Sequence, residues 1–207
     1  MEVEGRRYTP ALPLAVESYN TLRLGPYGGL VMVPSYGDQF LSTFNEQTYV
    51  GGNAGPAGIT TTIAFATTYT GLVLSNPLGS GVYLSLNQVQ ASFSVVFPAA
   101  ATIGIMVGYN ATTDVIHTTP LTTGRSTKVG TITTPKGKLD SSATLPTTPT
   151  LARCLGSVLA STIASYDVDL HSGLMLIPGA YAAIYTSTVS GAAALTATMD
   201  WDEIRFI

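Results

Sequence analysis

Ionic side chains are scarce in this chain. Only 10% of its 207 residues are Asp, Glu, Lys or Arg, against about 25% in an average soluble protein. The interval between Glu46 and Asp114 contains none of these residues and no histidine. Because a free monomer usually carries more charge to stay dispersed, the sequence predicts that other chains cover much of the surface. A surface coated with Thr, Ser and Asn is the alternative.

Other scarcities exclude further classes of protein. The formal net charge is −3 and the nine basic residues are scattered, whereas nucleic-acid-binding proteins cluster their cations; we expect no direct nucleic-acid partner. The single cysteine, Cys154, rules out an intrachain disulfide and disfavours a disulfide-stapled secreted module. No basic start with an unbroken apolar run opens the chain and no stretch of about 18 apolar residues follows, so we expect neither a signal peptide nor a membrane span.

Two regions differ in character, and they predict two parts. Residues 1–55 contain prolines, tyrosines and scattered charges, which suggests an extended N-terminal arm. The segment GGNAGPAG, residues 51–58, is typical of a flexible joint. From Ile59 onward Thr, Val, Ile, Tyr and Phe dominate, and Gly, Pro, Asn and Ser clusters recur at short intervals, which predicts a β domain over residues 56–207.

Alternation of apolar and polar side chains sets the register of several strands. Residues 195–203 alternate with period two, which predicts one buried and one wet face. Residues 82–97 change phase near Asn87–Gln88, which predicts a β-bulge or a strand break there. The strand AYAAIYTS, residues 180–187, has two weakly apolar faces. We expect the core to cover one face and a neighbouring subunit to cover the other.

The remaining segments complete a fold prediction. In TIGIMVGY, residues 102–109, two glycines on one face permit close approach of another backbone. Residues 118–150 form a long Thr- and Pro-rich insertion with a short strand expected near 128–133, and residues 151–164 are the only candidate helix. About eight strands with long connections predict an all-β, antiparallel jelly-roll β-sandwich with an extended N-terminal arm.

Four groups of polar residues are candidates for chemistry, and each also has a structural interpretation. The sequence favours the structural one for all four, and we expect no enzyme activity, no metal and no cofactor. Asp167, Asp169 and His171 alternate in a strand and have the donor atoms of a cation site, but a polar strand face has the same pattern. His117 has the chemistry of a general base, yet no nucleophile-elbow serine accompanies it; we expect a hydrogen-bonded turn histidine.

The other two groups are a thiol and a set of carboxylates. Cys154 lies in the apolar segment LARCLGSVLA without an activating base, so a buried small side chain is expected. Asp200, Asp202 and Glu203 could act as paired acids and bases in glycoside hydrolysis. A solvated, partly ion-paired sheet edge beside Arg205 is the favoured interpretation.

Tyrosines are the candidate contact residues. Tyr and other aromatic side chains supply much of the binding energy at protein interfaces, whereas Trp201 is expected in the core. The candidate oligomer or capsid contacts are Tyr8, Tyr19, Tyr27, Tyr36, Tyr181 and Tyr185.

Four segments carry a family resemblance: TTTIAFATTYTGLVLSNPLGSG from Thr60, FPAAATIGIMVGYNATTDVIHTTP from Phe97, LDSSATLPTTPTL from Leu139 and LIPGAYAAIYTSTVSGAAALTATMDWDEI from Leu176. Over about residues 40–204 the chain resembles small jelly-roll structural proteins of tailed bacteriophages. Some of these are head decoration, or cement, proteins, often trimeric. The resemblance brings no catalytic motif, and the N-terminal arm departs most from the shared pattern.

The resemblance implies a function that the residues alone do not name. We expect a virion structural protein on the capsid surface, assembled in the host cytoplasm, that stabilises the head as a homotrimer bound to the major capsid protein. The alternative is a tail or fibre tip module that binds host glycan, with Tyr109 and Asn110 as candidate contacts. A glycan hydrolase is the third hypothesis.

Overall fold

The computed structural model describes residues 42–53, 59–192 and 194–205 in full, together with the backbone of four short strands before them. Those strands are β1 (Glu4–Arg6), β2 (Tyr19–Thr21), β3 (Arg23–Leu24) and β4 (Leu30–Val31), and they pair antiparallel as β1–β2 and β3–β4. The chain divides into two compact units, Met1–Phe40 and Leu41–Ile207.

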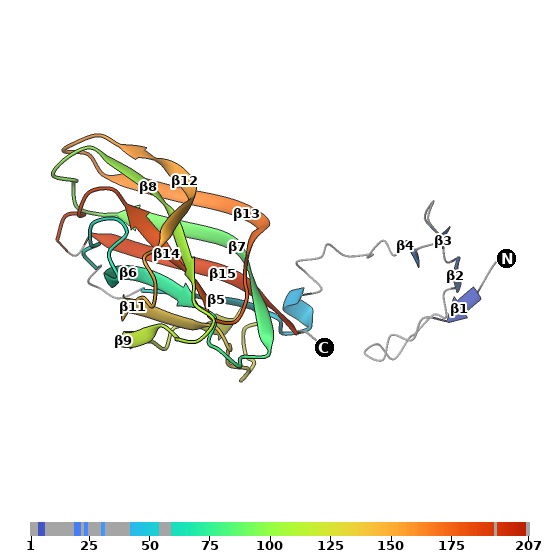
Figure 1. The fold of residues 1–207 in the computed structure, drawn as a ribbon. Helices are drawn as coiled ribbons and strands as arrows, with labels where there is room; N and C mark the ends of the chain where they lie inside the picture. The colour runs from blue at the N-terminus through green and yellow to red at the C-terminus, as the bar shows by residue number, and fades with distance from the viewer. Residues whose placement is uncertain are drawn as a thin grey trace. The chain divides into compact units, whose positions relative to one another are not determined.

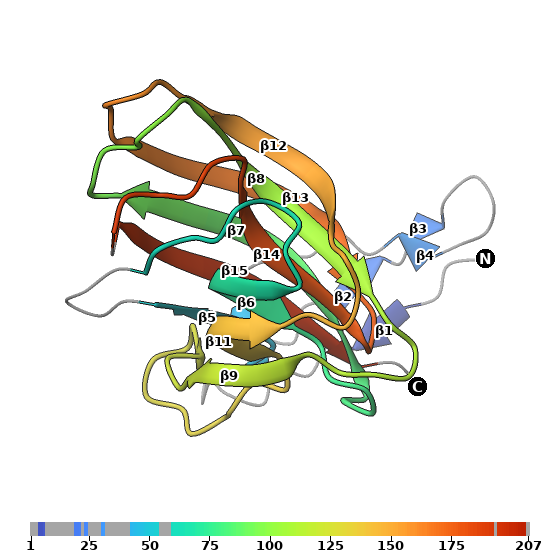
Figure 2. The ribbon, with the colours of Figure 1, turned by 60° about the vertical axis from the view of Figure 1, so that its left-hand side comes forward.

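The second unit consists of two antiparallel sheets packed face to face (Figures 1 and 2). The five-stranded sheet has the order β10 (Arg125–Ser126), β5 (Thr48–Gly52), β15 (Leu195–Arg205), β7 (Val82–Phe93), β13 (Ala164–Leu176). The six-stranded sheet has the order β12 (Thr150–Val158), β8 (Ala101–Tyr109), β14 (Ala180–Thr186), β6 (Thr68–Ser75), β11 (Lys138–Thr144), β9 (Ile116–Leu121).

The strand order confirms the predicted jelly roll. Without the insertion strands β9, β10 and β11, each sheet has four strands, ordered β5-β15-β7-β13 and β12-β8-β14-β6. The chain crosses between the sheets at every step except β8 to β12, where it stays in one sheet. This is the two-Greek-key arrangement of a double-sheet jelly roll. The inserted strands lengthen the two sheets at one side.

The core lies between the sheets and follows the alternation in the sequence. Along β15 the residues Leu195, Ala197, Met199 and Trp201 are buried, while the intervening Thr and Asp residues are not, as predicted. Trp201 is fully buried and stacks on Tyr49, with ring centroids 6.0 Å apart. Other large side chains buried beside it are Leu72, Leu74, Leu84, Leu86, Phe93, Phe97, Ile103 and Ile105.

The predicted bulge at Asn87 is confirmed. In the pairing of β7 with β15, Asp200 faces Gln88 and the next residue, Trp201, faces Leu86. Asn87 is therefore the extra residue, and the register with β13 shifts at the same place. The bulge lets both apolar halves of β7 face the core without ending the strand.

The predicted joint is wrong in part, and the sandwich begins earlier than residue 56. Gly51 and Gly52 belong to β5 and pair with β15. Asn53 is buried and holds the same strand, because its side chain donates to the Leu195 carbonyl (2.7 Å) and accepts from the Ala197 amide (2.6 Å). Residues 54–58 lie outside the described part of the chain. The compact unit starts at Leu41.

Two other local predictions are also wrong. The expected helix at 151–164 is β12, a turn and the start of β13. Apolar side chains occur there without clear period, and pairing with β8 decides the outcome. The expected strand at 128–133 is a loop between β10 and β11. Its shape comes from side-chain contacts with residues 44–46 rather than from a ladder.

The second face of β14 is covered by this chain and not by a neighbouring subunit. Tyr181 and Ala183 face away from the core and are fully buried in a second apolar cluster on the six-stranded sheet. Val115, before β9, and Leu145, after β11, are buried in the same cluster. The covering residues come from connections that are distant in sequence, which is why the strand pattern alone suggested another subunit.

Glycines on β8 make room for the tyrosines of β14. Tyr181 pairs with Gly108 and Tyr185 with Gly104. A Cβ on Gly108 would overlap the Tyr181 ring, and one on Gly104 would lie 2.5 Å from the Arg153 carbonyl oxygen. The predicted close approach at these glycines is therefore confirmed, by a backbone at Gly104 and by an aromatic ring at Gly108.

Candidate functional site

The structure keeps two of the three candidate cation ligands together, because Nδ1 of His171 lies 3.2 Å from Oδ1 of Asp169. Asp167 and Asp169 are exposed on β13, but the strand breaks register between Asp169 and Leu174, and His171 has a positive φ of 47°. The Asp167 carboxylate accepts a hydrogen bond from the Gln88 amide (2.6 Å). Within the described ranges no group of three His, Cys, Asp or Glu side chains is arranged to hold a metal ion.

His117 is hydrogen-bonded as predicted, but it lies in a strand and not in a turn. Its Nδ1 is 2.5 Å from Oδ2 of Asp140, across the pairing of β9 with β11. The Asp140 side chain is fully buried, and its Oδ1 has no partner among the described residues. Burial raises the pKa of Asp140, and the contact with His117 lowers it in part. Sequence reasoning did not identify Asp140, because no strand was expected at Lys138–Thr144.

The cysteine prediction is wrong. Cys154 is a free, exposed thiol on β12, at the edge of the six-stranded sheet. An edge strand has a partner on one side only, so its side chains are less covered than those of a central strand. The nearest polar atoms to its Sγ are the carbonyl oxygens of Ile103 (3.7 Å) and Gly156 (3.8 Å), and neither activates a thiol.

The three carboxylates near the C-terminus do not act as one group. Asp200 and Asp202 lie on the outer face of β15, where Oδ1 of Asp202 accepts a 2.5 Å hydrogen bond from Thr48. Glu203 points the other way and is buried. The prediction of a solvated sheet edge is wrong for all three, because β15 lies between β5 and β7 in the five-stranded sheet. Oε1 of Glu203 accepts the backbone amides of Lys136 (2.7 Å) and Gly137 (2.8 Å), and the Trp201 indole N–H lies 3.3 Å away.

Glu203 therefore fixes the insertion to the sandwich. Replacing it with alanine leaves three buried or half-buried N–H donors without an acceptor and should lower the free energy of unfolding by about 2 kcal/mol. Glu203→Gln keeps an acceptor oxygen at the same place and should cost less than half of that. Urea unfolding followed by Trp201 fluorescence measures both. Equal losses in the two variants would show that the acceptor role is wrong.

Asp200 predicts a pH dependence of stability. Burial, with a smaller contribution from the Asp167 charge, raises its pKa from 3.8 to about 6. The native state therefore binds this proton more tightly than the unfolded chain, so this group's contribution to stability falls as the pH rises from about 4 to about 6. Asp200→Asn should remove that fall and be more stable than the parent at pH 7. Thermal melts at pH 4, 5, 6 and 7 test this; an unchanged pH profile would contradict it.

Asn110, a candidate glycan contact in the loop after β8, is hydrogen-bonded within that loop. Tyr109 is half exposed, but Oδ1 of Asn110 accepts the backbone amides of Thr112 and Thr113, both at 2.9 Å. This is a turn held by an Asx side chain, so the Asn110 oxygen is committed to the fold.

The tyrosines that were predicted as contact residues differ in their exposure. Tyr181 is fully buried and donates to the Thr147 carbonyl (2.5 Å), so it offers no surface to another chain. Tyr185 is half-buried and its ring packs against Phe65, with centroids 5.1 Å apart. Tyr19 lies in β2, of which only the backbone is described. Three further candidates, Tyr8, Tyr27 and Tyr36, lie outside the described residues.

One end of the sandwich carries a group of exposed apolar side chains in neighbouring loops. We call it the uncharged end; it consists of loops 94–100, 159–163 and 187–192, at the left of Figure 1. Its exposed aliphatic residues are Val95, Val96, Leu159 (74% exposed), Ile163 (64% exposed) and Val189. None of the three loops contains a charged residue. Contiguous exposed apolar surface of this kind marks interaction sites.

The three loops form one ordered surface. Phe97 is fully buried, and its backbone exchanges hydrogen bonds with the 159–163 loop: its N–H reaches the Thr162 carbonyl (3.1 Å), and its carbonyl accepts from Ser161 (2.9 Å). Ser187 pairs with Thr102 through its backbone (3.0 Å) and its hydroxyl (2.8 Å). Loops fixed by such bonds lose little conformational entropy when they bind.

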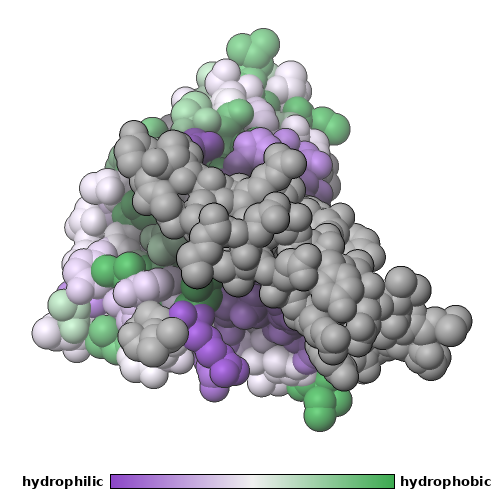
Figure 3. Space-filling model, turned by 90° about the vertical axis from the view of Figure 1, so that its right-hand side faces the viewer, coloured by the Kyte–Doolittle hydropathy of each residue, from purple (hydrophilic) through white to green (hydrophobic). Residues whose placement is uncertain are grey.

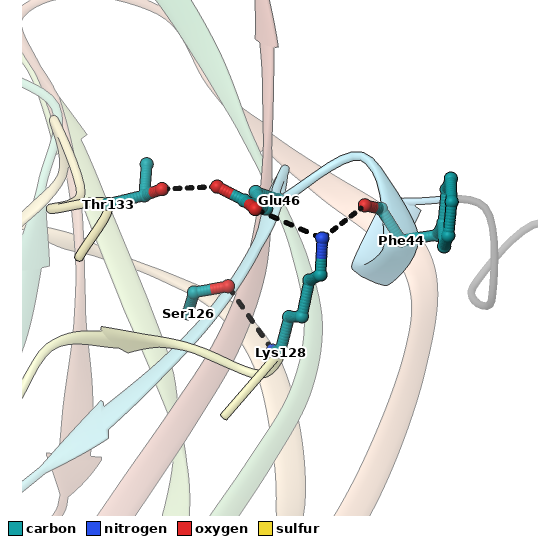
Figure 4. A network of polar contacts seen from close by, with 5 residues as sticks. All are labelled: Phe44, Glu46, Ser126, Lys128 and Thr133. Atoms are coloured by element: carbon teal, nitrogen blue, oxygen red, sulfur yellow. Dashed lines mark hydrogen bonds and ion pairs between the residues drawn. The ribbon is translucent and has the colours of Figure 1, made fainter. Parts of the chain in front are cut away.

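The charged residues gather at the opposite end. The connection from β10 to β11 meets the start of β5 there, and Lys128 donates to Oε1 of Glu46 (3.0 Å) and to the Phe44 carbonyl (3.3 Å) (Figure 4). Thr133 donates to the other carboxylate oxygen of Glu46 (2.5 Å). These contacts lower the pKa of Glu46, with the Thr133 bond as the largest cause.

A cleft of about 410 Å³ adjoins this network, and its lining includes Glu46, Lys136, Glu203 and Arg205. Figure 3 looks at this side of the molecule and shows both hydrophilic and hydrophobic side chains exposed on it. Ionic groups are therefore concentrated at this end, which also exposes Val129 (90%) and Ile132 (98%), whereas the uncharged end exposes aliphatic side chains with no charge beside them.

No family model, curated protein or solved structure matches the chain. In the part of the chain that the structure describes, no helix is long and apolar enough to cross a membrane. The fold and the surfaces above are thus the observations on which a function can be argued.

Proposed function

We propose that the chain is a capsid decoration, or cement, protein of a tailed bacteriophage, which acts as a homotrimer on the major capsid protein at the capsid surface. The observation that carries the proposal is the uncharged end of the sandwich. Its aliphatic side chains are exposed on fixed, uncharged loops at one end, and a surface of that kind is suited to permanent contacts between subunits. The resemblance over residues 40–204 supplies the phage setting.

The scaffold suits a structural role. The jelly roll holds its loops through two packed sheets with a continuous core, so a contact surface at one end keeps its shape. The charged end lies where the sandwich continues toward residue 41, and it offers polar groups for a second, different contact. A decoration protein needs both kinds of contact: one with its own copies and one with the shell.

Localisation in purified particles tests the proposal. Particles of the virus that encodes this chain should contain it in multiple copies on the head, visible as density on the capsid by electron cryo-microscopy. Particles that lack the protein should lose DNA at a lower temperature than complete ones. Absence from particles, or density confined to the tail, would contradict the proposal.

One observation favours the second candidate function, recognition of host glycan. A groove of about 290 Å³ lies on the outer face of the five-stranded sheet, and its polar lining is Gln90, Ser92, Ser165, Asp167, Thr196 and Thr198. Hydroxyl, amide and carboxylate groups on rigid strands suit a neutral polyhydroxylated ligand. Glycan-array binding that is lost in a Gln90→Ala variant, together with a tail location, would favour this function over decoration.

A further inference from the structure

Each loop of the uncharged end belongs to a long stretch of sequence without charge. Residues 47–113, 154–166 and 172–199 contain no Asp, Glu, Lys, Arg or His. Each of the three loops of the uncharged end lies inside one of these intervals. The intervals are separate in sequence, and only the jelly-roll connections place them side by side (Figure 2).

The nearest ionic residues along the strands are well back from the loops. Arg153 lies five residues before the end of β12, and Asp167 three residues after the start of β13. At about 3.3 Å per residue these intervals place the two charges roughly 17 and 10 Å from the ends of their strands. A surface several side chains wide is therefore free of charge.

From this arrangement we propose that the uncharged end is the surface through which copies of this chain bind one another. The inference rests on the proposed function and assigns its subunit contact to particular loops. A copy of the chain presents the same neutral, apolar surface. Three such surfaces can therefore converge around the axis of a trimer without like-charge repulsion and without removing an unpaired charge from water.

The size and composition of the surface agree with a contact between copies. The three loops comprise about 18 residues, close to the 20–30 residues per side of a standard interface. The loops also contain small residues, Ala99, Ala100 and Ala192, which allow close approach of a second backbone. Gly191 packs against Val95, where a Cβ would lie 2.5 Å from that side chain.

Charged variants at exposed positions test the assignment. Leu159→Asp places a carboxylate in the centre of the proposed contact, and Ile132→Asp is the matched control, because Ile132 is 98% exposed in the loop between β10 and β11. Sedimentation velocity on the purified full chain should show an oligomer for the parent and for Ile132→Asp. Leu159→Asp should associate at least about 100-fold more weakly. Thermal melts establish that both variants are folded.

A mixing experiment identifies the partner. If the same loops of three copies converge, an equimolar mixture of Leu159→Asp and Leu159→Lys chains should reassociate, since mixed trimers bring opposite charges together, while each variant alone stays dissociated. If Leu159→Asp does not fold, Ile163→Asp and Ile163→Lys replace the pair.

Three outcomes overturn the inference: a parent chain that is monomeric at micromolar concentration, an oligomer that Leu159→Asp leaves intact, or a mixture that does not reassociate. An intact oligomer in Leu159→Asp leaves the decoration role standing, because the contact would then lie elsewhere. An oligomer that depends on Leu159 but is absent from phage heads contradicts the decoration role and keeps the inference.

Discussion

Replacing His117 with alanine should lower the free energy of unfolding by about 3 kcal/mol at pH 8. The reason is the carboxylate that it leaves behind. Asp140 is fully buried, its Oδ2 lies 2.5 Å from Nδ1 of His117, and its other oxygen has no partner among the described residues. Removal of the imidazole therefore leaves a buried charge without a hydrogen-bond donor, which costs more than the contact itself contributes.

A double-mutant cycle separates this effect from simple loss of packing. Asp140→Asn removes the charge, so His117→Ala should cost far less in the Asp140→Asn background than in the parent. Thr118→Ala, at the neighbouring exposed position of β9, should have almost no effect. Urea unfolding gives all four free energies. If the two changes are additive, the buried carboxylate is not the cause.

The contact between His117 and Asp140 also predicts how the stability loss in His117→Ala depends on pH. Burial raises the pKa of Asp140, and His117 opposes that rise; His117→Ala should therefore raise this pKa further. The native state then binds the proton more tightly than the unfolded chain, so the variant gains stability relative to the parent as the pH falls toward 4. The loss caused by His117→Ala should thus be largest at pH 8 and smallest near pH 4.

The sequence was sufficient to predict most of the fold, because the decisive signals are local. Alternation in residues 195–203 predicted one buried and one wet face, and a phase change placed the bulge at Asn87. The segment at 151–164 was assigned wrongly because a short apolar run without a period suits either a buried strand or a helix. Pairing with β8, about 50 residues away, settles it.

In the sequence, the only sign of the uncharged end was a lack of charged residues. The interval without charge from 47 to 113 predicted covered surface, but its meaning depends on where the loops meet. Exposure of Leu159 and Ile163 could not be predicted, because a helix was expected there. The contact between His117 and Asp140 also escaped prediction, since 23 residues separate them and the strand pairing is bulged. Aromatic character suggested Tyr181 as an interface residue, whereas a glycine opposite it makes room for its ring inside the chain.

Replacing Gly108, the glycine opposite Tyr181, also has a large expected effect. Gly108→Ala should destabilise the protein by about 3 kcal/mol. The new Cβ would overlap the Tyr181 ring, which is fully buried and bonded to the Thr147 carbonyl. The ring cannot move outward without losing that bond and disturbing its contacts with Val73 and Met106 in the second apolar cluster.

The sign of the effect should reverse when the ring is removed. Tyr181→Val destabilises the protein by itself, but in that background Gly108→Ala should be neutral or stabilising by about 0.5 kcal/mol, because alanine in a strand costs less backbone entropy than glycine. Urea unfolding of the two single variants and the double variant measures the coupling. Equal costs in both backgrounds would mean that strain in the β8 backbone, and not the cross-strand ring, requires glycine at this position. A reversal of sign would establish that the Tyr181 ring, packed on the outer face of the six-stranded sheet, is what requires glycine at this position.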